Sequence, residues 1–287
     1  MNGPVPSAPL PAQVDALVDA LLAPEPGARD GADPEELHQM RVAVRRLRVL
    51  LKVSGDPLGP AVGGVRRELG WLGSVLGEVR DLDVLIEHLR EVVRGFDEVD
   101  REPGERLVAE FGARRERARR RMIAALDGDR YPALVRDLRA LSGGDVADRG
   151  PGGDLVAAVR RSYRKLCRAV AALPDDPPDA DLHALRITSK RLRYVAEAAR
   201  RAADPKRARR LKQLVKACGR LQAVLGEHQD AVVCARRVRE VAGDDPAVCF
   251  VAGRIVQHEA ARRARARARW PETLDDIHAA AAALGLE

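Results

Sequence analysis

Two stretches of this sequence place a histidine and several basic residues at helical spacing. The first row is made of His38, Arg41, Arg45, Arg48 and Lys52, and the second row is made of His183, Arg186, Lys190 and Arg193. At about 100° per residue, each row falls in a band roughly 80° wide along one side of a helix. Guanidinium groups bind phosphate oxygens in pairs, and ammonium groups bind them as point charges. Each row could therefore contact successive phosphates of a long polyanion.

No acidic residue interrupts the first row, because none occurs between Leu37 and Val53. A solvated helix face usually places a carboxylate four residues from a cation, which relieves like-charge repulsion. His38 and His183 lie in the first turn of their helices, where free N–H groups and the helix dipole favour anions. One such row alone is typical of a solvated face in an arginine-rich protein. Its repetition at the same register favours a binding site.

The helix expected after the second row supplies more cations. The segment from Lys206 to Arg220 holds seven basic residues and no acidic one. Its members on one side are Arg209, Lys212, Lys216 and Arg220, and Lys216 matches Arg67 in the first half of the chain. We include these five residues among the expected phosphate contacts.

Other charged clusters have simpler interpretations. Glu78, Asp81 and Asp83, with Glu227 and Asp230 in the second half, could ligate a metal, but ion pairs with the two rows are the favoured interpretation. The basic segments 114–121 and 262–269 are typical of solvated helix faces. No nucleophile with a base and no glycine-rich phosphate loop occurs. We expect no catalysis, no cofactor and no resident metal.

The elements that would position these residues are helices. Only 3% of the 287 residues are aromatic, and apolar residues recur at helical spacing, which favours an all-α fold over a sheet. The expected helices cover residues 12–22, 34–53, 61–95, 103–126, 131–141, 154–173, 179–203, 205–241, 246–269 and 272–284. Residues 1–11 are expected to form a flexible proline-rich tail. Asp33, followed by Pro34, is a strong helix start.

Composition also bounds the partners and the compartment. The net charge of +7 and the pI near 9.6 favour polyanionic partners. The four cysteines are far apart in sequence, which favours reduced thiols over a zinc ribbon or a disulfide framework. The N-terminus lacks the features of a secretory signal, and no run of about 18 apolar residues occurs. We expect a soluble cytoplasmic protein that does not contact a membrane.

The two halves of the chain resemble each other. Residues 37–48 match residues 182–193 at a distance of 145 residues, and residues 76–81 match residues 225–230 at a distance of 149 residues. Two matched blocks in the same order indicate a duplicated unit. The halves are expected at about 12–141 and 154–284, with a divide in the loop 142–153. A pseudo-twofold axis between two helical bundles would bring both rows to one groove or pore.

These blocks resemble the CHAD family, the conserved histidine α-helical domain. The resemblance rests on the repeated His–Arg motifs, on Leu76–Val84, and on a late helix with Gly253 followed by Trp270. It covers residues 12 to 284 as a single domain. The departures are local: Gln229 stands where the first half has Arg80, and Glu197 stands where it has Lys52.

The resemblance implies two pseudo-symmetric bundles around a basic central cavity. It also implies non-catalytic binding of inorganic polyphosphate and association with polyphosphate granules. Many relatives carry a triphosphate tunnel hydrolase domain, and none is expected ahead of residue 12 here. Two alternatives stay open: a nucleic-acid binder, which the scarcity of aromatic residues disfavours, and a metal-dependent phosphohydrolase that uses Glu78, Asp81 and Asp230.

Overall fold

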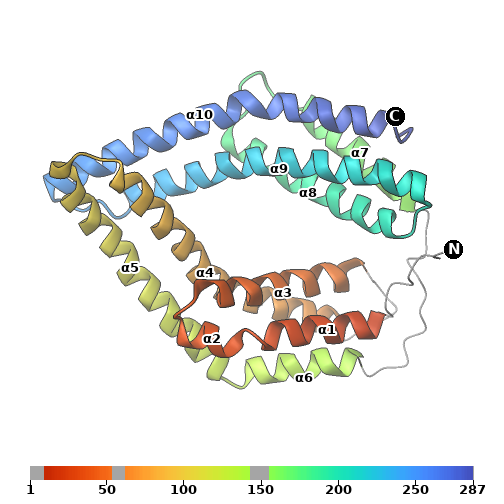
Figure 1. Cartoon of the computed structure of the whole chain (residues 1–287), viewed down its shortest axis with the longest axis horizontal. Coiled ribbons are helices and arrows are strands. Elements are labelled where there is room, and N and C mark those ends of the chain that lie inside the picture. The colour runs from red at the N-terminus through yellow and green to blue at the C-terminus, as the bar shows by residue number, and fades with distance from the viewer. Residues whose placement is uncertain (1–9, 54–61, 143–154, 287) are drawn as a thin grey trace. The chain divides into compact units, whose positions relative to one another are not determined.

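The chain is all-helical wherever its structure is described. The computed structural model describes residues 10–53, 62–142 and 155–286, and every regular element in these ranges is a helix (Figure 1). This confirms the expected all-α class. The chain divides into two compact units, Met1–Gly152 and Gly153–Glu287. Residues 1–9 of the expected tail and nearly all of the expected loop at 142–153 lie outside the described ranges, whereas Leu10 and Pro11 already belong to the first helix.

The first unit contains six described helices. They are α1 (Leu10–Leu22), α2 (Glu25–Asp30), α3 (Pro34–Val53), α4 (Val62–Arg94), α5 (Glu98–Asp127) and α6 (Arg130–Ser142). Helix α4 packs against α3, α5 and α6, and α1 packs against α3 and α6. The apolar side of α3 is buried as its spacing predicted, since Leu37, Met40 and Leu47 are all in the core. The first row borders this buried side and is held in place by it.

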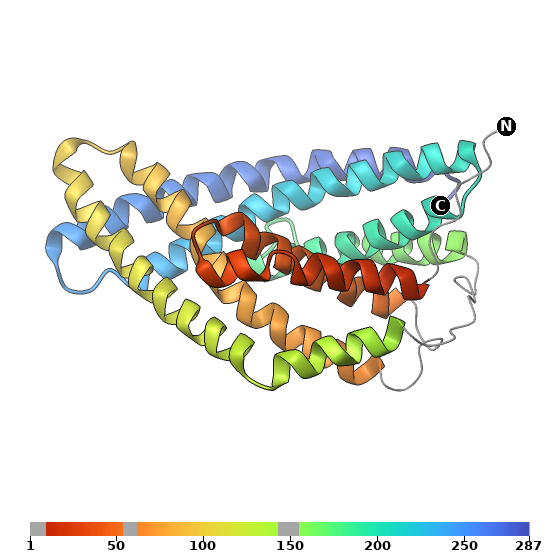
Figure 2. The ribbon, with the colours of Figure 1, turned by 60° about the horizontal axis from the view of Figure 1, so that its bottom comes forward.

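The second unit contains four helices. They are α7 (Leu155–Ala171), α8 (Asp179–Arg201), α9 (Pro205–Arg239) and α10 (Pro246–Ala282). Helix α9 packs against both α8 and α10, and α7 packs against α8. Figures 1 and 2 both show α9 and α10 side by side along most of their length. Leu182 and Leu192 of α8 are buried in the core of this unit together with Leu214 of α9 and Ile277 of α10.

Aspartate caps begin several of these helices. The carboxylate of Asp33 accepts the N–H of Glu35 at 2.8 Å, directly ahead of Pro34, as the sequence predicted. Asp204 accepts the N–H of Arg207 at the start of α9, and Asp245 accepts two N–H groups at the start of α10. A proline occupies the first position of α3, α9 and α10, where its missing N–H costs nothing. The starts of α3, α9 and α10 are therefore fixed locally.

The structure differs from the expected helices at three places. Helix α2 was not expected, and it ends at Gly31, whose φ of 79° favours glycine. Helix α5 begins at Glu98 rather than at Pro103, and α10 continues through Pro271 instead of breaking there. A proline removes one backbone hydrogen bond, but Leu274 and Ile277 beyond Pro271 are buried, and their packing outweighs that loss. None of the described helices is both long enough and apolar enough to cross a bilayer.

Candidate functional site

The first row forms a largely exposed edge of α3. Arg45, Arg48 and Lys52 are exposed to solvent, whereas His38 and Arg41 are half-buried. Arg67, from the matching position on α4, is exposed as well. All five row residues lie on α3 next to the buried apolar side, as their spacing predicted. This edge presents three solvent-exposed cations.

Arg41 is the member of the first row that packs most tightly. Its Nη1 atom lies 3.0 Å from Asp81 Oδ1, and both residues remain partly exposed. The same guanidinium lies over Gly77 of α4, since a Cβ atom added there would come within 2.6 Å of Arg41 Nη1. Gly77 and Asp81 are one helical turn apart on α4. The α4 helix therefore fixes where Arg41 points.

The second row is less exposed than the first. His183, Arg186, Lys190 and Arg193 are all half-buried along α8. Lys190 Nζ and Arg193 Cζ lie 6.0 Å and 5.6 Å from the ring centroid of Tyr194. Such cation–π contacts stabilise a cation that has lost part of its water. This edge therefore presents cations held against protein surface.

The second row also contains polar atoms that are buried without a hydrogen-bond partner. Within the described residues these are His183 Nδ1, Arg186 Nε and Arg193 Nε. Arg193 Nε lies 3.4 Å from Glu197 Oε1, close enough for an ion pair but without hydrogen-bond geometry. Arg186 packs over Gly226 of α9, where an added Cβ atom would lie 3.7 Å from Nε. Arg41 and Arg186 thus lie over the glycines of the two matched Leu-Gly-Glu segments.

The basic residues of α9 fall into two groups. Lys212, Gly219 and Gly226 are spaced seven residues apart, so Lys212 lies on the side of α9 that faces Arg186. Arg209, Lys212 and Lys216 are exposed. Arg220 Nε instead lies 2.8 Å from Asp276 Oδ2 of α10. The charge of Arg220 is already partly neutralised within its own unit.

Four of the carboxylates singled out in the sequence form ion pairs that the structure defines, three of them with other partners than expected. Asp81 pairs with Arg41 of the first row. Glu78 pairs with Arg121 of α5, and Arg115 Nε donates to Asp83 Oδ1 at 2.5 Å. In the second unit, Glu227 pairs with Arg269 of α10 at 3.1 Å. The guanidinium partners neutralise Glu78, Asp81, Asp83 and Glu227, so these groups are poorly placed to share a cation.

The basic segments of α5 and α10 are more than solvated faces. In the first unit, Arg119 Nη2 donates to the carbonyls of Arg29 and Asp30, at 2.5 and 2.7 Å, just ahead of α3. In the second unit, Arg267 Nη2 donates to the carbonyl of Pro177 at 2.7 Å, just ahead of α8. Arg119 therefore links α5 to the segment before α3, the helix of the first row. Arg267 links α10 in the same way to the segment before α8, the helix of the second row.

These arginines belong to a third matched block, which the sequence interpretation missed. Residues 113–121 and 261–269 match at a distance of 148 residues, and the pairs Arg119/Arg267 and Arg121/Arg269 occupy equal places in them. The signal was present in the sequence. Alternating alanine and arginine is, however, too common in this chain to stand out without the contacts.

A histidine outside both rows lies deep in the second unit. His228 of α9 is 1% exposed, and its Nε2 lies 3.0 Å from Oδ1 of Asp179, the first residue of α8. Arg263 Nη2 and Arg267 Nη1 lie 2.6 and 3.4 Å from the same carboxylate oxygen. Burial lowers the pKa of His228, Asp179 opposes that effect, and the two arginines add to it. This cluster fixes the start of α8 and hence the place of His183.

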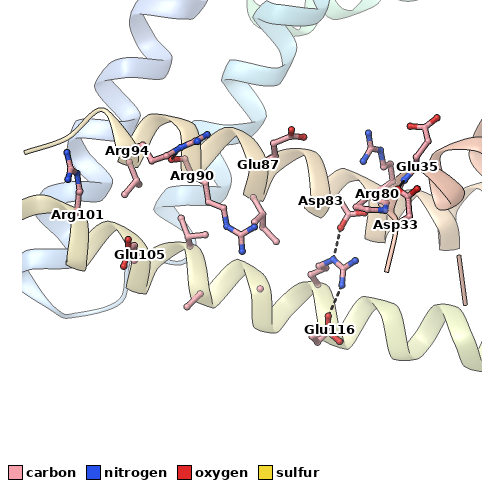
Figure 3. A pocket seen from close by; sticks show the side chains of 17 residues that line it. Asp33, Glu35, Arg80, Asp83, Glu87, Arg90, Arg94, Arg101, Glu105 and Glu116 are labelled. Carbon is pink, nitrogen blue, oxygen red and sulfur yellow. Dashed lines mark hydrogen bonds and ion pairs between the residues drawn. The ribbon is translucent and has the colours of Figure 1, made fainter. Parts of the chain in front are cut away.

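A cleft of about 1140 Å³ opens between α4 and α5 in the first unit (Figure 3). Five arginines and six carboxylates line it, and none of them is a predicted contact residue. Arg115 of α5 donates to Asp83 of α4 and to Glu116, and Figure 3 draws a dashed line to each of these two carboxylates. The near balance of charges makes this cleft a poor site for a polyanion. The two rows remain the better candidates.

Comparisons with known proteins agree with the helical architecture. The family model of the CHAD domain matches residues 12–239. The structure is similar to that of the CHAD domain from the plant Ricinus communis, with a TM-score of 0.72 and 27% identity, covering 94% of this chain and 90% of that one. It is also similar in fold to PptA from Streptomyces chartreusis, with a TM-score of 0.70 and 21% identity over 93% and 98% of the two chains.

Two curated relatives come from Mycobacterium tuberculosis. They are the uncharacterized protein MT2285 of strain CDC 1551 / Oshkosh and the uncharacterized protein Rv2226 of strain ATCC 25618 / H37Rv. Each is 33% identical over 293 aligned positions, which cover 93% of this chain and 52% of the relative. The chain thus spans about half the length of the curated relatives it matches.

Proposed function

The chain belongs to the CHAD family, and from that premise we propose that it binds inorganic polyphosphate through its two basic rows. The observation that carries the proposal is the second row, in which three buried nitrogen atoms lack any hydrogen-bond partner within the described residues. Buried polar atoms are nearly always paired, so such atoms suggest a missing acceptor. Phosphate oxygens are suitable acceptors, and they bring additional negative charge to the row.

We propose further that the two units arose by duplication, so that the rows are equivalent in origin. The matched contacts support this. Glu78 pairs with Arg121 as Glu227 pairs with Arg269, and in each unit the preceding connection is held by an arginine from the matched block. The family resemblance adds the expectation that both rows line one basic central cavity. A single polyphosphate chain would then contact both.

The binding is proposed to be non-catalytic. Hydrolysis of a phosphoanhydride bond needs a positioned water and a way to stabilise the leaving phosphate, for which enzymes commonly use carboxylate-bound metal ions. In this chain Glu78 and Asp81 each form an ion pair with an arginine instead. A polyphosphate binder of this kind would associate with polyphosphate granules in the cytoplasm.

Titration calorimetry tests the proposal. We expect long-chain polyphosphate to bind tightly, with an affinity that falls steeply as salt rises, because binding releases counterions. RNA of equal phosphate concentration serves as the competitor. If RNA displaces polyphosphate at comparable phosphate concentration, the protein is a general polyanion or nucleic-acid binder and the proposal is wrong.

A second assay addresses the hydrolase alternative. Incubation with polyphosphate and Mg²⁺ or Mn²⁺ should release no orthophosphate above the rate without protein. Release that disappears in the Asp81→Ala variant would instead identify a metal-dependent phosphohydrolase. Because Asp81 holds Arg41, the same variant must also be compared with wild type for binding.

A further inference from the structure

The two rows differ in the environment of their side chains, although their sequences match. In the first row Arg45, Arg48 and Lys52 are exposed, whereas in the second row the equivalent Lys190 and Arg193 are half-buried. Exposed cations interact through screened, non-directional attraction. Half-buried cations interact in a lower effective dielectric and with fixed direction. The environment alone therefore predicts different modes of anion binding.

The unpartnered atoms lie in one row only. Within the described residues, five side-chain N or O atoms are buried without a partner, and three of them belong to His183, Arg186 and Arg193. None belongs to the first row. Arg41, the residue equivalent to Arg186, instead has the carboxylate of Asp81 at 3.0 Å.

Burial of an unpaired N–H group costs free energy that an incoming acceptor recovers. In the second row, the Nε donors of Arg186 and Arg193 have already lost water before any ligand arrives. Their side chains are half-buried rather than fully buried, so rotation of the guanidinium groups would present these donors to an anion beside α8. Such a site discriminates by geometry and not only by charge.

We infer that the second row is a directional site for individual phosphoryl groups, and that the first row attracts the rest of a chain without selecting its geometry. This inference rests on the proposed function and assigns each row a different part in polyphosphate binding. It predicts that a short phosphate chain, such as tripolyphosphate, depends mainly on the second row. Long chains depend on both rows, and the first row carries most of their salt dependence.

Charge-conserving substitutions separate geometry from charge. Arg186→Lys keeps the charge but removes the planar guanidinium and its Nε donor, and Arg45→Lys makes the same chemical change at an exposed arginine of the first row. We expect Arg186→Lys to weaken tripolyphosphate binding about tenfold or more, because charge-assisted hydrogen bonds are lost. Arg45→Lys should change it less than about twofold, as expected for an exposed cation. Circular dichroism and the unfolding midpoint verify that both variants fold.

Charge-removing substitutions give the second arm. The pairs His38→Gln with Arg45→Gln, and His183→Gln with Arg186→Gln, remove the same groups from each row. We expect the first pair to lower the salt dependence of long-chain binding by about one charge, roughly 0.7–0.9 in the log–log slope. The second pair should reduce tripolyphosphate affinity at low and high salt alike.

The outcomes are distinguishable. Equal losses in the two lysine variants, for both ligands, would show that the rows are equivalent and overturn this inference while polyphosphate binding stands. Absence of binding of tripolyphosphate and long-chain polyphosphate to the wild-type chain would overturn the proposed function itself. If Arg186→Lys loses tripolyphosphate affinity and Arg45→Lys keeps it, the result supports both the proposed function and this inference.

Discussion

The guanidinium of Arg41 lies directly on the backbone of Gly77, so close that an added Cβ atom would approach Nη1 to 2.6 Å. Gly77→Ala should therefore push Arg41 out of its place beside Asp81. The change should also raise helix propensity, which favours stability by about 0.5–1 kcal/mol. We expect the variant to be at least as stable as wild type and to bind polyphosphate about three- to tenfold more weakly. Denaturant unfolding and calorimetry measure the two effects separately.

Gly226→Ala is the matched control in the second unit. Its Cβ atom would lie 3.7 Å from Arg186 Nε, which is an ordinary contact. The same gain in propensity is expected, with binding unchanged within about twofold. If Gly77→Ala and Gly226→Ala reduce binding equally, displacement of Arg41 is not the cause.

Arg119 and Arg267 should stabilise the starts of the row helices. Arg119 holds two carbonyls ahead of α3, and Arg267 holds the Pro177 carbonyl and the carboxylate of Asp179 at the start of α8. Methionine keeps the length of the side chain and removes its donors. We expect Arg119→Met and Arg267→Met each to lower the free energy of unfolding by about 1.5–3 kcal/mol.

Arg265→Met is the control for these variants, because Arg265 is exposed on the same helix as Arg267. It should change the free energy of unfolding by less than about 0.5 kcal/mol. Urea denaturation followed by circular dichroism gives all three values. A loss at Arg265 equal to that at Arg267 would mean that net charge, not the anchoring of the connection, governs stability.

Local features of the fold were predictable from the sequence. The burial of Leu37, Met40 and Leu47 follows from their spacing, and the cap by Asp33 follows from the residues around it. The spacing also predicts that the residues of each row lie along one side of their helix. All of these depend on residues within one or two helical turns, where spacing alone decides the geometry.

Contacts between distant segments were not predictable in this way. Glu78 was expected to pair with a row and pairs with Arg121, 43 residues away in sequence. His228 was given no role and contacts Asp179 at the start of α8. The continuation of α10 through Pro271 depends on buried residues beyond it. In each case the outcome depends on which helices meet, and many arginines compete for each carboxylate.

His228 should make the stability of the chain depend on pH. Its folded pKa is lowered from 6.5, chiefly by burial and against the effect of Asp179. Below pH 6.5 the unfolded chain therefore binds a proton that the folded chain does not, and the free energy of unfolding falls as pH drops. The contribution is fully present above pH 6.5 and is lost progressively toward the lower, folded pKa.

The His228→Gln variant tests this prediction. Glutamine can still donate a hydrogen bond to Asp179 but does not titrate. We expect the free energy of unfolding of the variant to fall less steeply than that of wild type between about pH 7 and pH 5. If the free energies of unfolding of the two proteins fall in parallel as pH drops, other groups cause the loss of stability.

The four cysteines should differ in reactivity. Cys218 and Cys234 are buried, and burial raises the pKa of each thiol to about 12. Cys249 is exposed and Cys167 is half-buried. Because the thiolate is the reactive form, a thiol reagent should label Cys249 first, Cys167 more slowly, and the other two only after unfolding. Mass spectrometry of the labelled peptides identifies the order, and early labelling of Cys218 would contradict the packing of its core.

Removal of charge from the rows should affect polyphosphate binding more than equal removal elsewhere. We expect Arg41→Ala with Arg45→Ala to weaken binding and to lower its salt dependence by about 1.5 in the log–log slope. Arg186→Ala with Lys190→Ala should weaken binding as well, with a smaller change in the slope. Arg263 is unsuitable as a control because it holds Asp179. Arg164→Ala with Arg168→Ala removes two exposed charges from α7 instead and should leave binding nearly unchanged. If this pair weakens binding as much as the row variants do, only net charge attracts the polymer, and the rows have no special role.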